Sequence, residues 1–170
     1  FSEGGNVIIQ NCTFINNSAY LDDHHSNPGG AVYLSNTSGS SIDHSTFIGN
    51  RANSGGAVYI DGNHNITNSV FTNNRASRGG AVYSTNPNVN AVYLVNNSFV
   101  NNAHTGIGGV GGAIYSASVL TYIRNSTFYG RNQIILDGNT YRSTVYLSGN
   151  NQTSPSHSDD EYMVQSTNVD

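Results

Sequence analysis

The stretch GGAVYLSNTSGSSIDHSTFIGNRANSGGAVYIDGNHNITNSVFTNNRASRGGAVY, residues 29–83, alternates two short motifs. The first is a glycine pair followed by alanine, an aliphatic residue and tyrosine. It begins at Gly29, Gly55, Gly79 and Gly111. The second is a phenylalanine followed three residues later by asparagine. It begins at Phe14, Phe47, Phe71 and Phe99, and Phe128 starts a fifth copy that ends in Arg131. Because the phenylalanines lie 24 to 33 residues apart, we expect a fold of stacked repeats.

The composition of the repeats favours strands over helices. The repeats are rich in Gly, Asn, Val, Thr and Tyr, which are poor helix formers. Their apolar residues recur at every second position, as in Val-x-Leu and Ala-x-Tyr, which is the period of two that strands show. A propeller blade needs roughly 40 residues, whereas about 24 suffice for one coil with strands of about three to five residues. We therefore predict an all-β fold, a parallel β-helix (solenoid) of about six coils over residues 1–147. Residues 148–170 are a polar segment without repeats, expected to act as a cap or as a contact between subunits.

In a stacked fold each residue lies on its counterpart one coil away, so equivalent positions form columns. An internal aromatic column is predicted for Phe14, Phe47, Phe71, Phe99 and Phe128. An aliphatic column is predicted for Val32, Val58, Val82, Ile114 and Val145. The glycine pairs are expected to adopt φ angles that other residues avoid. Left-handed backbone conformations and a ladder of amide hydrogen bonds are predicted for Asn17, Asn50, Asn74 and Asn102.

The alternation of GGA[VI] and FxxN resembles the repeat of the chlamydial polymorphic outer membrane proteins, over roughly residues 4–147. The resemblance implies a right-handed parallel β-helix that is exported and displayed at the cell surface, with an adhesive or structural role. It implies no catalytic site. We therefore expect an extracellular or surface location for a rigid rod or a subunit of a surface fibre.

The bulk composition excludes several classes of partner. The chain has 170 residues, a net charge of -4 and no lysine, which is not the basic surface that nucleic acid requires. No apolar run approaches the roughly 18 residues of a membrane span. The chain begins within a repeat, so it is expected to be a piece of a longer protein. The partners expected are other copies docked end to end, or neighbouring repeats of a longer chain, and glycans.

Two other functions remain as alternatives. Pectate lyases and polygalacturonases share the predicted fold, so a carbohydrate-active enzyme acting on acidic polysaccharide is one of them. Such enzymes need clustered carboxylates, but no acidic residue recurs at one repeat position, so no enzyme is predicted. Binding to ice or to another regular lattice is the second alternative function and ranks last, because no regular Thr-x-Thr array is visible in the sequence.

One insertion carries four consecutive groups that can bind metals, Asp22, Asp23, His24 and His25. Two carboxylates and two imidazoles can hold a divalent cation. Adjacent side chains seldom converge on one ion, so a solvated loop is the alternative reading. No other cofactor is expected.

Two columns of side chains are candidates for ligand binding. Arg51 and Arg75 should lie one coil apart, where they can grip an acidic sugar or a partner carboxylate, or remain solvated. Tyr33, Tyr59, Tyr83 and Tyr115 should face outward as a ladder. Such a ladder can bind sugar rings or a neighbouring protein, or pack on itself.

Sequons for N-glycosylation are frequent in this Asn-rich chain, partly by chance. Candidate acceptors are Asn36 and Asn151, which lie in polar stretches, together with Asn65 and Asn16. Asn11, Asn96 and Asn125 precede the motif phenylalanine by three residues, where a structural turn is a sufficient explanation.

Overall fold

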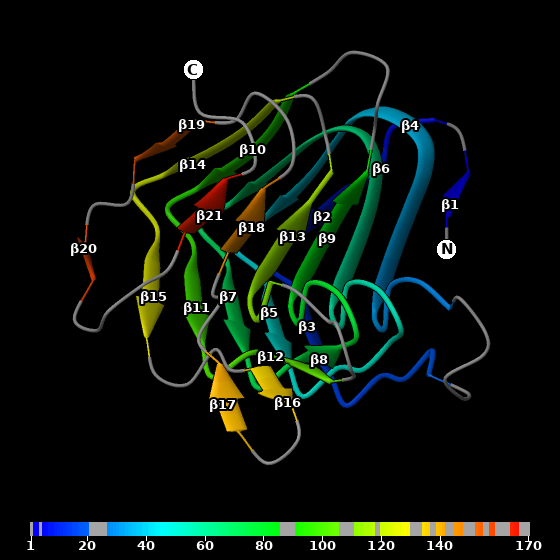
Figure 1. The fold of residues 1–170 in the computed structure, drawn as a ribbon. Coiled ribbons are helices and arrows are strands. Elements are labelled where there is room, and N and C mark those ends of the chain that lie inside the picture. The colour runs from blue at the N-terminus through cyan, green and yellow to red at the C-terminus, as the bar shows by residue number, and fades with distance from the viewer. Residues whose placement is uncertain are drawn as a thin grey trace.

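The computed structural model describes residues 2–3, 5–20, 27–85, 91–105, 111–117, 120–129, 134–136, 139–141, 145–147, 152–154, 157–158 and 164–166. Every regular element in these residues is a strand, and the strands form three sheets. Strands of successive repeats lie side by side in each sheet (Figure 1). The described pairs are parallel except that of β16 with β17. The chain is therefore all-β, with parallel strands in stacked sheets, as a β-helix requires.

The large sheet contains the strands that follow each glycine pair and the strands that precede each FxxN motif. Its members are β1 (Ser2–Glu3), β2 (Ile8–Gln10), β4 (Val32–Asp43), β6 (Val58–Thr67), β9 (Val82–Thr85), β10 (Ala91–Val95), β13 (Ile114–Ser116), β14 (Leu120–Arg124), β18 (Val145–Leu147), β19 (Gln152–Ser154) and β21 (Val164–Ser166). Beyond β6 the sheet divides into two arms, because β9 pairs with the first part of β6 and β10 with its last part.

Two smaller sheets complete each repeat. The six-stranded sheet follows chain order with β3 (Thr13–Ile15), β5 (Thr46–Ile48), β7 (Val70–Thr72), β11 (Ser98–Val100), β15 (Thr127–Tyr129) and β20 (His157–Ser158). The four-stranded sheet contains β8 (Arg75–Ala76), β12 (Ala103–Thr105), β16 (Ile134–Leu136) and β17 (Asn139–Tyr141). Within residues 148–170, β19, β20 and β21 pair with β14, β15 and β18, so these strands extend the existing sheets.

The expectation of strands of three to five residues is wrong for the first two full repeats. β4 has 12 residues and β6 has 10, and they pair with each other along most of their length. The pairing continues through register shifts between Leu34 and Thr37 and between Ser38 and Ser40. Gly39 and Gly62 have φ angles of 79° and 136°, which let the backbone bend without leaving the sheet.

The predicted aromatic column is confirmed. Phe14, Phe47, Phe71, Phe99 and Phe128 are register partners on successive strands of the six-stranded sheet. Their ring centroids lie 4.8 to 5.0 Å apart, with interplanar angles of 9° or less. Phe47, Phe71 and Phe99 are completely buried. The sheet spacing of about 4.8 Å thus sets the stacking distance of the rings.

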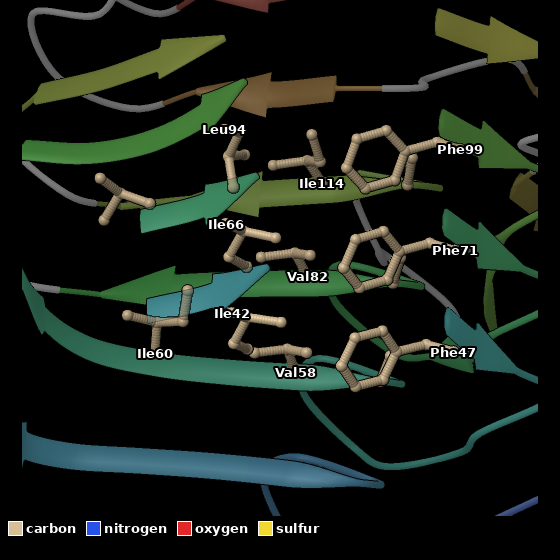
Figure 2. Packing of buried hydrophobic residues seen from close by; sticks show 14 of the residues in the cluster. Ile42, Phe47, Val58, Ile60, Ile66, Phe71, Val82, Leu94, Phe99 and Ile114 are labelled. Carbon is tan, nitrogen blue, oxygen red and sulfur yellow. The ribbon is translucent and has the colours of Figure 1, made fainter. Parts of the chain in front are cut away.

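The predicted aliphatic column is confirmed as well. Val32, Val58, Val82, Ile114 and Val145 are register partners in the large sheet, and the first four are buried. Figure 2 shows Val58, Val82 and Ile114 facing the phenylalanine rings, with Ile42, Ile66 and Leu94 in a further column beside them. The core is therefore built from parallel columns, each contributed by one position of the repeat.

The two glycines of the motif have different roles. The first has a positive φ, 65° at Gly55 and 60° at Gly79, as predicted. The second does not need positive φ, but a Cβ added at Gly56 would lie 2.1 Å from the Gly80 carbonyl oxygen and 2.6 Å from that of Arg75. The backbone of the next coil occupies the space of a side chain. The second glycine is thus required by the close approach of coils.

The asparagine ladder is confirmed, but its predicted backbone conformation is wrong. The side-chain amide of Asn17 donates to Asn50 Oδ1 at 2.9 Å, and those of Asn50 and Asn74 donate to the next member at 3.0 Å. The left-handed residues are instead the ones immediately before the ladder. These are Asn16, Gly49, Asn73 and Asn101, with φ between 51° and 64°. The turn residue bends the chain, so that the next asparagine can point inward.

Candidate functional site

The four predicted tyrosines form one column on the outer side of the large sheet. Tyr33, Tyr59, Tyr83 and Tyr115 are register partners and all are half-buried. Ring centroids lie 4.9 to 5.0 Å apart, and all contacts are stacked except the edge-to-face contact of Tyr33 with Tyr59. Burial, with the neighbouring phenols Tyr83 and Tyr33, raises the pKa of Tyr59. The column therefore consists of half-buried rings that pack on one another.

The two predicted arginines are bridge partners on adjacent coils, and a third arginine follows Arg75 by three residues in the chain. Arg51 and Arg75 form a parallel bridge between neighbouring coils, and both side chains are exposed. The Arg51 guanidinium lies 3.9 Å from the ring centroid of Tyr20, a cation–π contact. Arg78, which the sequence analysis did not single out, is exposed and bridges to Ser54. The signal was present in the sequence, because Arg78 stands where the other repeats have Pro28 and Ser54 before the glycine pair. We call Arg51, Arg75 and Arg78 the arginine patch.

The predicted metal ligands Asp22, Asp23, His24 and His25 lie outside the described residues. In the part of the chain that the structure describes, no group of three or more His, Cys, Asp and Glu side chains is placed to hold a metal ion. Divalent cation binding by the insertion therefore stays a prediction.

Asp43 is the centre of a polar cluster that the sequence did not indicate. Its carboxylate accepts hydrogen bonds from Thr67 Oγ1 at 2.6 Å and from Asn68 Nδ2 at 2.8 Å, and it lies 2.7 Å from His44 Nδ1. These hydrogen bonds, led by that of Thr67, hold the pKa of Asp43 well below its usual range. His44 occupies a left-handed corner position that is asparagine in the other repeats. The hydrogen bonds among these four residues satisfy the Asp43 carboxylate and account for the arrangement of the cluster.

The glycosylation candidates have different surroundings. Asn65 is exposed in the middle of β6, between its register partners Ser41 and Tyr93. Asn16 is exposed and has a φ of 54°. Asn36 lies in β4, but its side chain is outside the described part, as is all of Asn151. Asn11, Asn96 and Asn125 have φ of 53°, 57° and 47°, which confirms the structural turn expected for them.

Two buried histidines were missed. His104 is 1% exposed, between Ala76 and Ile134 of the neighbouring coils, and neither ring nitrogen has a hydrogen-bond partner among the described residues. Burial lowers the pKa of His104 to about 4. His64 is 2% exposed in β6, and burial likewise lowers the pKa of His64. Alignment of Asn102-Ala-His with Asn74-Arg-Ala would have shown His104 in an alanine position.

The outer side of the six-stranded sheet carries two regular columns of uncharged residues, which we call the β-branched face. One column is Thr13, Thr46, Val70, Ser98 and Thr127, and the other is Ile15, Ile48, Thr72, Val100 and Tyr129. Three of the exposed large apolar side chains in the described residues lie here: Ile15 at 55%, Val70 at 38% and Tyr129 at 55%. The array is mixed rather than Thr-x-Thr. The residues flanking each motif phenylalanine could have revealed it.

The repeat of the Chlamydia polymorphic membrane proteins matches residues 11–35, 44–61 and 68–85. Three segments of the chain are thus similar to the repeat of this family. Each of the three matched segments contains one FxxN motif and one GGAVY motif. The predicted resemblance is therefore confirmed for three repeats in the first 85 residues. The copies at Phe99 and Gly111 lie beyond these matches, although the structure stacks them in the same columns.

No curated protein and no solved structure matches the chain. The polymorphic membrane protein repeat is a surface-protein repeat and not a known enzyme family, which favours a surface location. In the described residues no helix is both long and apolar enough to cross a membrane.

Proposed function

We propose that the chain is a non-catalytic structural and adhesion module, built as a rigid right-handed parallel β-helix of about six coils. The observation that carries this proposal is the continuity of the internal columns. Phenylalanine rings stack without interruption from Phe14 to Phe128, and side-chain amides link Asn17 to Asn102. Such columns make each coil depend only on its neighbours, which is the basis of a solenoid rod.

The adhesive surface in this proposal is the β-branched face. Exposed apolar patches mark interaction sites in soluble proteins. Here every residue of the patch lies on a strand of one sheet, and the patch carries no charge. Its side chains repeat along the rod at the strand spacing of about 4.8 Å. A rigid and periodic face of this kind suits contact with an extended surface more than capture of a small molecule.

The absence of catalysis is part of the proposal and is supported by the repeat family, which is not an enzyme family. Incubation with polygalacturonate is expected to release no new sugar ends. Cleavage that is lost on substitution of an aspartate would show that the polysaccharide-degrading alternative is correct.

A second copy of the chain is the proposed end-to-end partner, and it would dock on the edge formed by β2 and β3. Sheet order ends at β3, and Ile8 on β2 is 74% exposed. Open strand edges recruit further strands. Sedimentation velocity over a hundredfold concentration range tests this, and a monomer at every concentration would exclude self-association.

The adhesion role is tested with beads coated with the purified chain, flowed over cell layers at controlled shear. Val70→Glu with Thr72→Glu places charges on the β-branched face, and Asn65→Glu is the control at an exposed strand position of another sheet. We expect the face variant to lose about tenfold in retained beads, and the control to match the wild type. Equal retention of all three proteins would exclude the face as the contact. No retention of wild-type beads would exclude adhesion.

A further inference from the structure

We propose that the arginine patch binds an acidic polysaccharide whose carboxylate or sulfate groups span two neighbouring coils. This inference names a ligand class for the adhesion module and rests on that proposed function. The site is distinct from the β-branched face, so the two can be tested separately. Stacking of two repeats makes Arg51 and Arg75 bridge partners on adjacent coils, and Arg78 follows Arg75 by three residues on the same coil.

Positive charge is concentrated at this place in a chain that is otherwise acidic. The protein has ten acidic residues and only six arginines, with a net charge of -4. Three of the six arginines lie on two adjacent coils, and all three side chains are exposed. Among the residues that the structure describes, none of the three has an ion-pair partner, whereas Asp43 is already engaged by Thr67, Asn68 and His44. The patch therefore has unused capacity for anions.

The fold does not require arginine at these positions. The counterpart of Arg51 in the coil before is Ser18, and the counterpart of Arg75 in the coil after is Ala103. The counterparts of Arg78 are Ser54 and Pro28. Small neutral residues thus satisfy the same backbone positions, while arginines one coil apart repel each other. An anion between the guanidiniums replaces that repulsion by attraction.

Tyr20 holds one guanidinium in a fixed place. The Arg51 guanidinium carbon lies 3.9 Å from the ring centroid of Tyr20, which is a cation–π contact. A cation–π contact leaves the guanidinium its N–H donors, which form planar bidentate bonds with a carboxylate or sulfate. Fixing the side chain in advance lowers the entropy that binding must overcome.

The spacing and number of the charges favour a polysaccharide over nucleic acid. Duplex DNA carries one charge per about 1.7 Å, and proteins that bind it have a strong net positive surface. Three arginines on a chain of charge -4 are too few for that polymer. A glycan with at most a few charges per sugar unit is repelled less than duplex DNA by the acidic remainder of the protein. Its hydroxyls can also form hydrogen bonds with the surrounding polar residues.

Binding of the intact chain to immobilised polygalacturonate (carboxylate) and heparin (sulfate) tests the proposal, with dextran as the neutral control and duplex DNA as the competing polyanion. The triple variant Arg51→Ser, Arg75→Ala, Arg78→Ser uses residues that stand at equivalent positions in other coils. Arg124→Gln, at an exposed arginine of the large sheet, is the matched control. Equal thermal midpoints of wild type and variants verify folding.

We expect the wild type to bind at least one acidic glycan, with affinity that falls as salt rises. The triple variant should bind about tenfold more weakly, as three exposed charge pairs predict, and Arg124→Gln within about twofold of wild type. Equal binding by the triple variant, no binding by the wild type, or tighter binding to DNA would each overturn the proposal. Loss of glycan binding with normal bead adhesion would separate this site from the β-branched face. Normal glycan binding without bead adhesion would refute only the proposed function.

Discussion

The asparagine ladder allows a quantitative test of how the coils are held together. The side chain of Asn74 makes four hydrogen bonds. Its Oδ1 accepts from the backbone N–H of Asn50 at 2.9 Å and from Asn50 Nδ2 at 3.0 Å. Its Nδ2 donates to the Phe47 carbonyl and to Asn102 Oδ1, both at 3.0 Å. Asn50, Asn74 and Asn102 are completely buried, so water cannot replace these bonds.

The substitution Asn74→Ala removes all four bonds, but some partners keep others. Asn50 Nδ2 still donates to the Phe14 carbonyl, and Asn102 Oδ1 still accepts from the Asn74 backbone. The Asn50 N–H loses its side-chain partner, whereas the Phe47 carbonyl also belongs to the parallel ladder of β5 with β7. Each buried polar group left unsatisfied costs about 1–3 kcal/mol. The free energy of unfolding should therefore fall by about 1–3 kcal/mol.

Urea unfolding followed by circular dichroism measures this loss. The matched control is Asn96→Gly. Asn96 belongs to an exposed ladder, with bonds to Asn68 and Asn125, and glycine preserves its φ of 57°. The control should lose less than about 1 kcal/mol, because water replaces exposed hydrogen bonds. Equal losses in the two variants, or a loss below about 1 kcal/mol for Asn74→Ala, would refute the reasoning that the buried ladder stabilises the stack.

Three further predictions concern the core, the corner and the buried histidine. Phe71→Ala removes a ring that is stacked on both faces and should cost about 3–5 kcal/mol in urea unfolding; a loss below about 1 kcal/mol would contradict the proposed packing. Gly56→Ala places a methyl group against the Gly80 carbonyl, so its thermal midpoint should fall well below that of Ser54→Ala, a control at the same corner; equal midpoints would contradict the close approach. His104 has a pKa of about 4 when folded and 6.5 as its ordinary value, so the neutral form is favoured by folding, and stability should be lost as pH falls from 6.5 to about 4. The full difference is about 3 kcal/mol, and His104→Ala should flatten this part of the pH profile of unfolding; an unchanged profile would contradict the burial of an uncharged imidazole.

The columns of Phe and Val were predictable because they depend on one assumption only, that equivalent positions of a repeat stack. The role of the second glycine was not predictable in the same way. At Gly56 the constraint comes from the backbone of the next coil, which the local sequence does not contain. The left-handed conformation was assigned one residue too late because two consecutive residues, as in Asn73 and Asn74, both suit a turn. Only the hydrogen bonds distinguish the residue that bends from the residue that points inward.

The surfaces were harder to predict than the core. Arg51 and Arg75 follow directly from the repeat, but Arg78 joins them only through the corner that follows β8. The β-branched face depends on which side of the six-stranded sheet is solvent-exposed, and this becomes clear only when the phenylalanines are known to point inward. His104 occupies a column that is alanine in the neighbouring coil, so the repeat pattern by itself does not indicate a buried histidine there.

Disulfide trapping tests the central claim most directly, that neighbouring repeats stack in parallel with FxxN on FxxN. In a background with Cys12→Ser, the pair Thr72→Cys and Val100→Cys joins register partners of β7 and β11. Parallel partners lie about 4.8 Å apart, within the range of about 4.4–6.8 Å between Cα atoms of a disulfide. The pair Thr72→Cys and Ser98→Cys joins positions two residues out of register, about 8 Å apart. We predict rapid intramolecular crosslinking of the first pair under mild oxidation and little of the second, and preferential crosslinking of the second pair would contradict the stacked register.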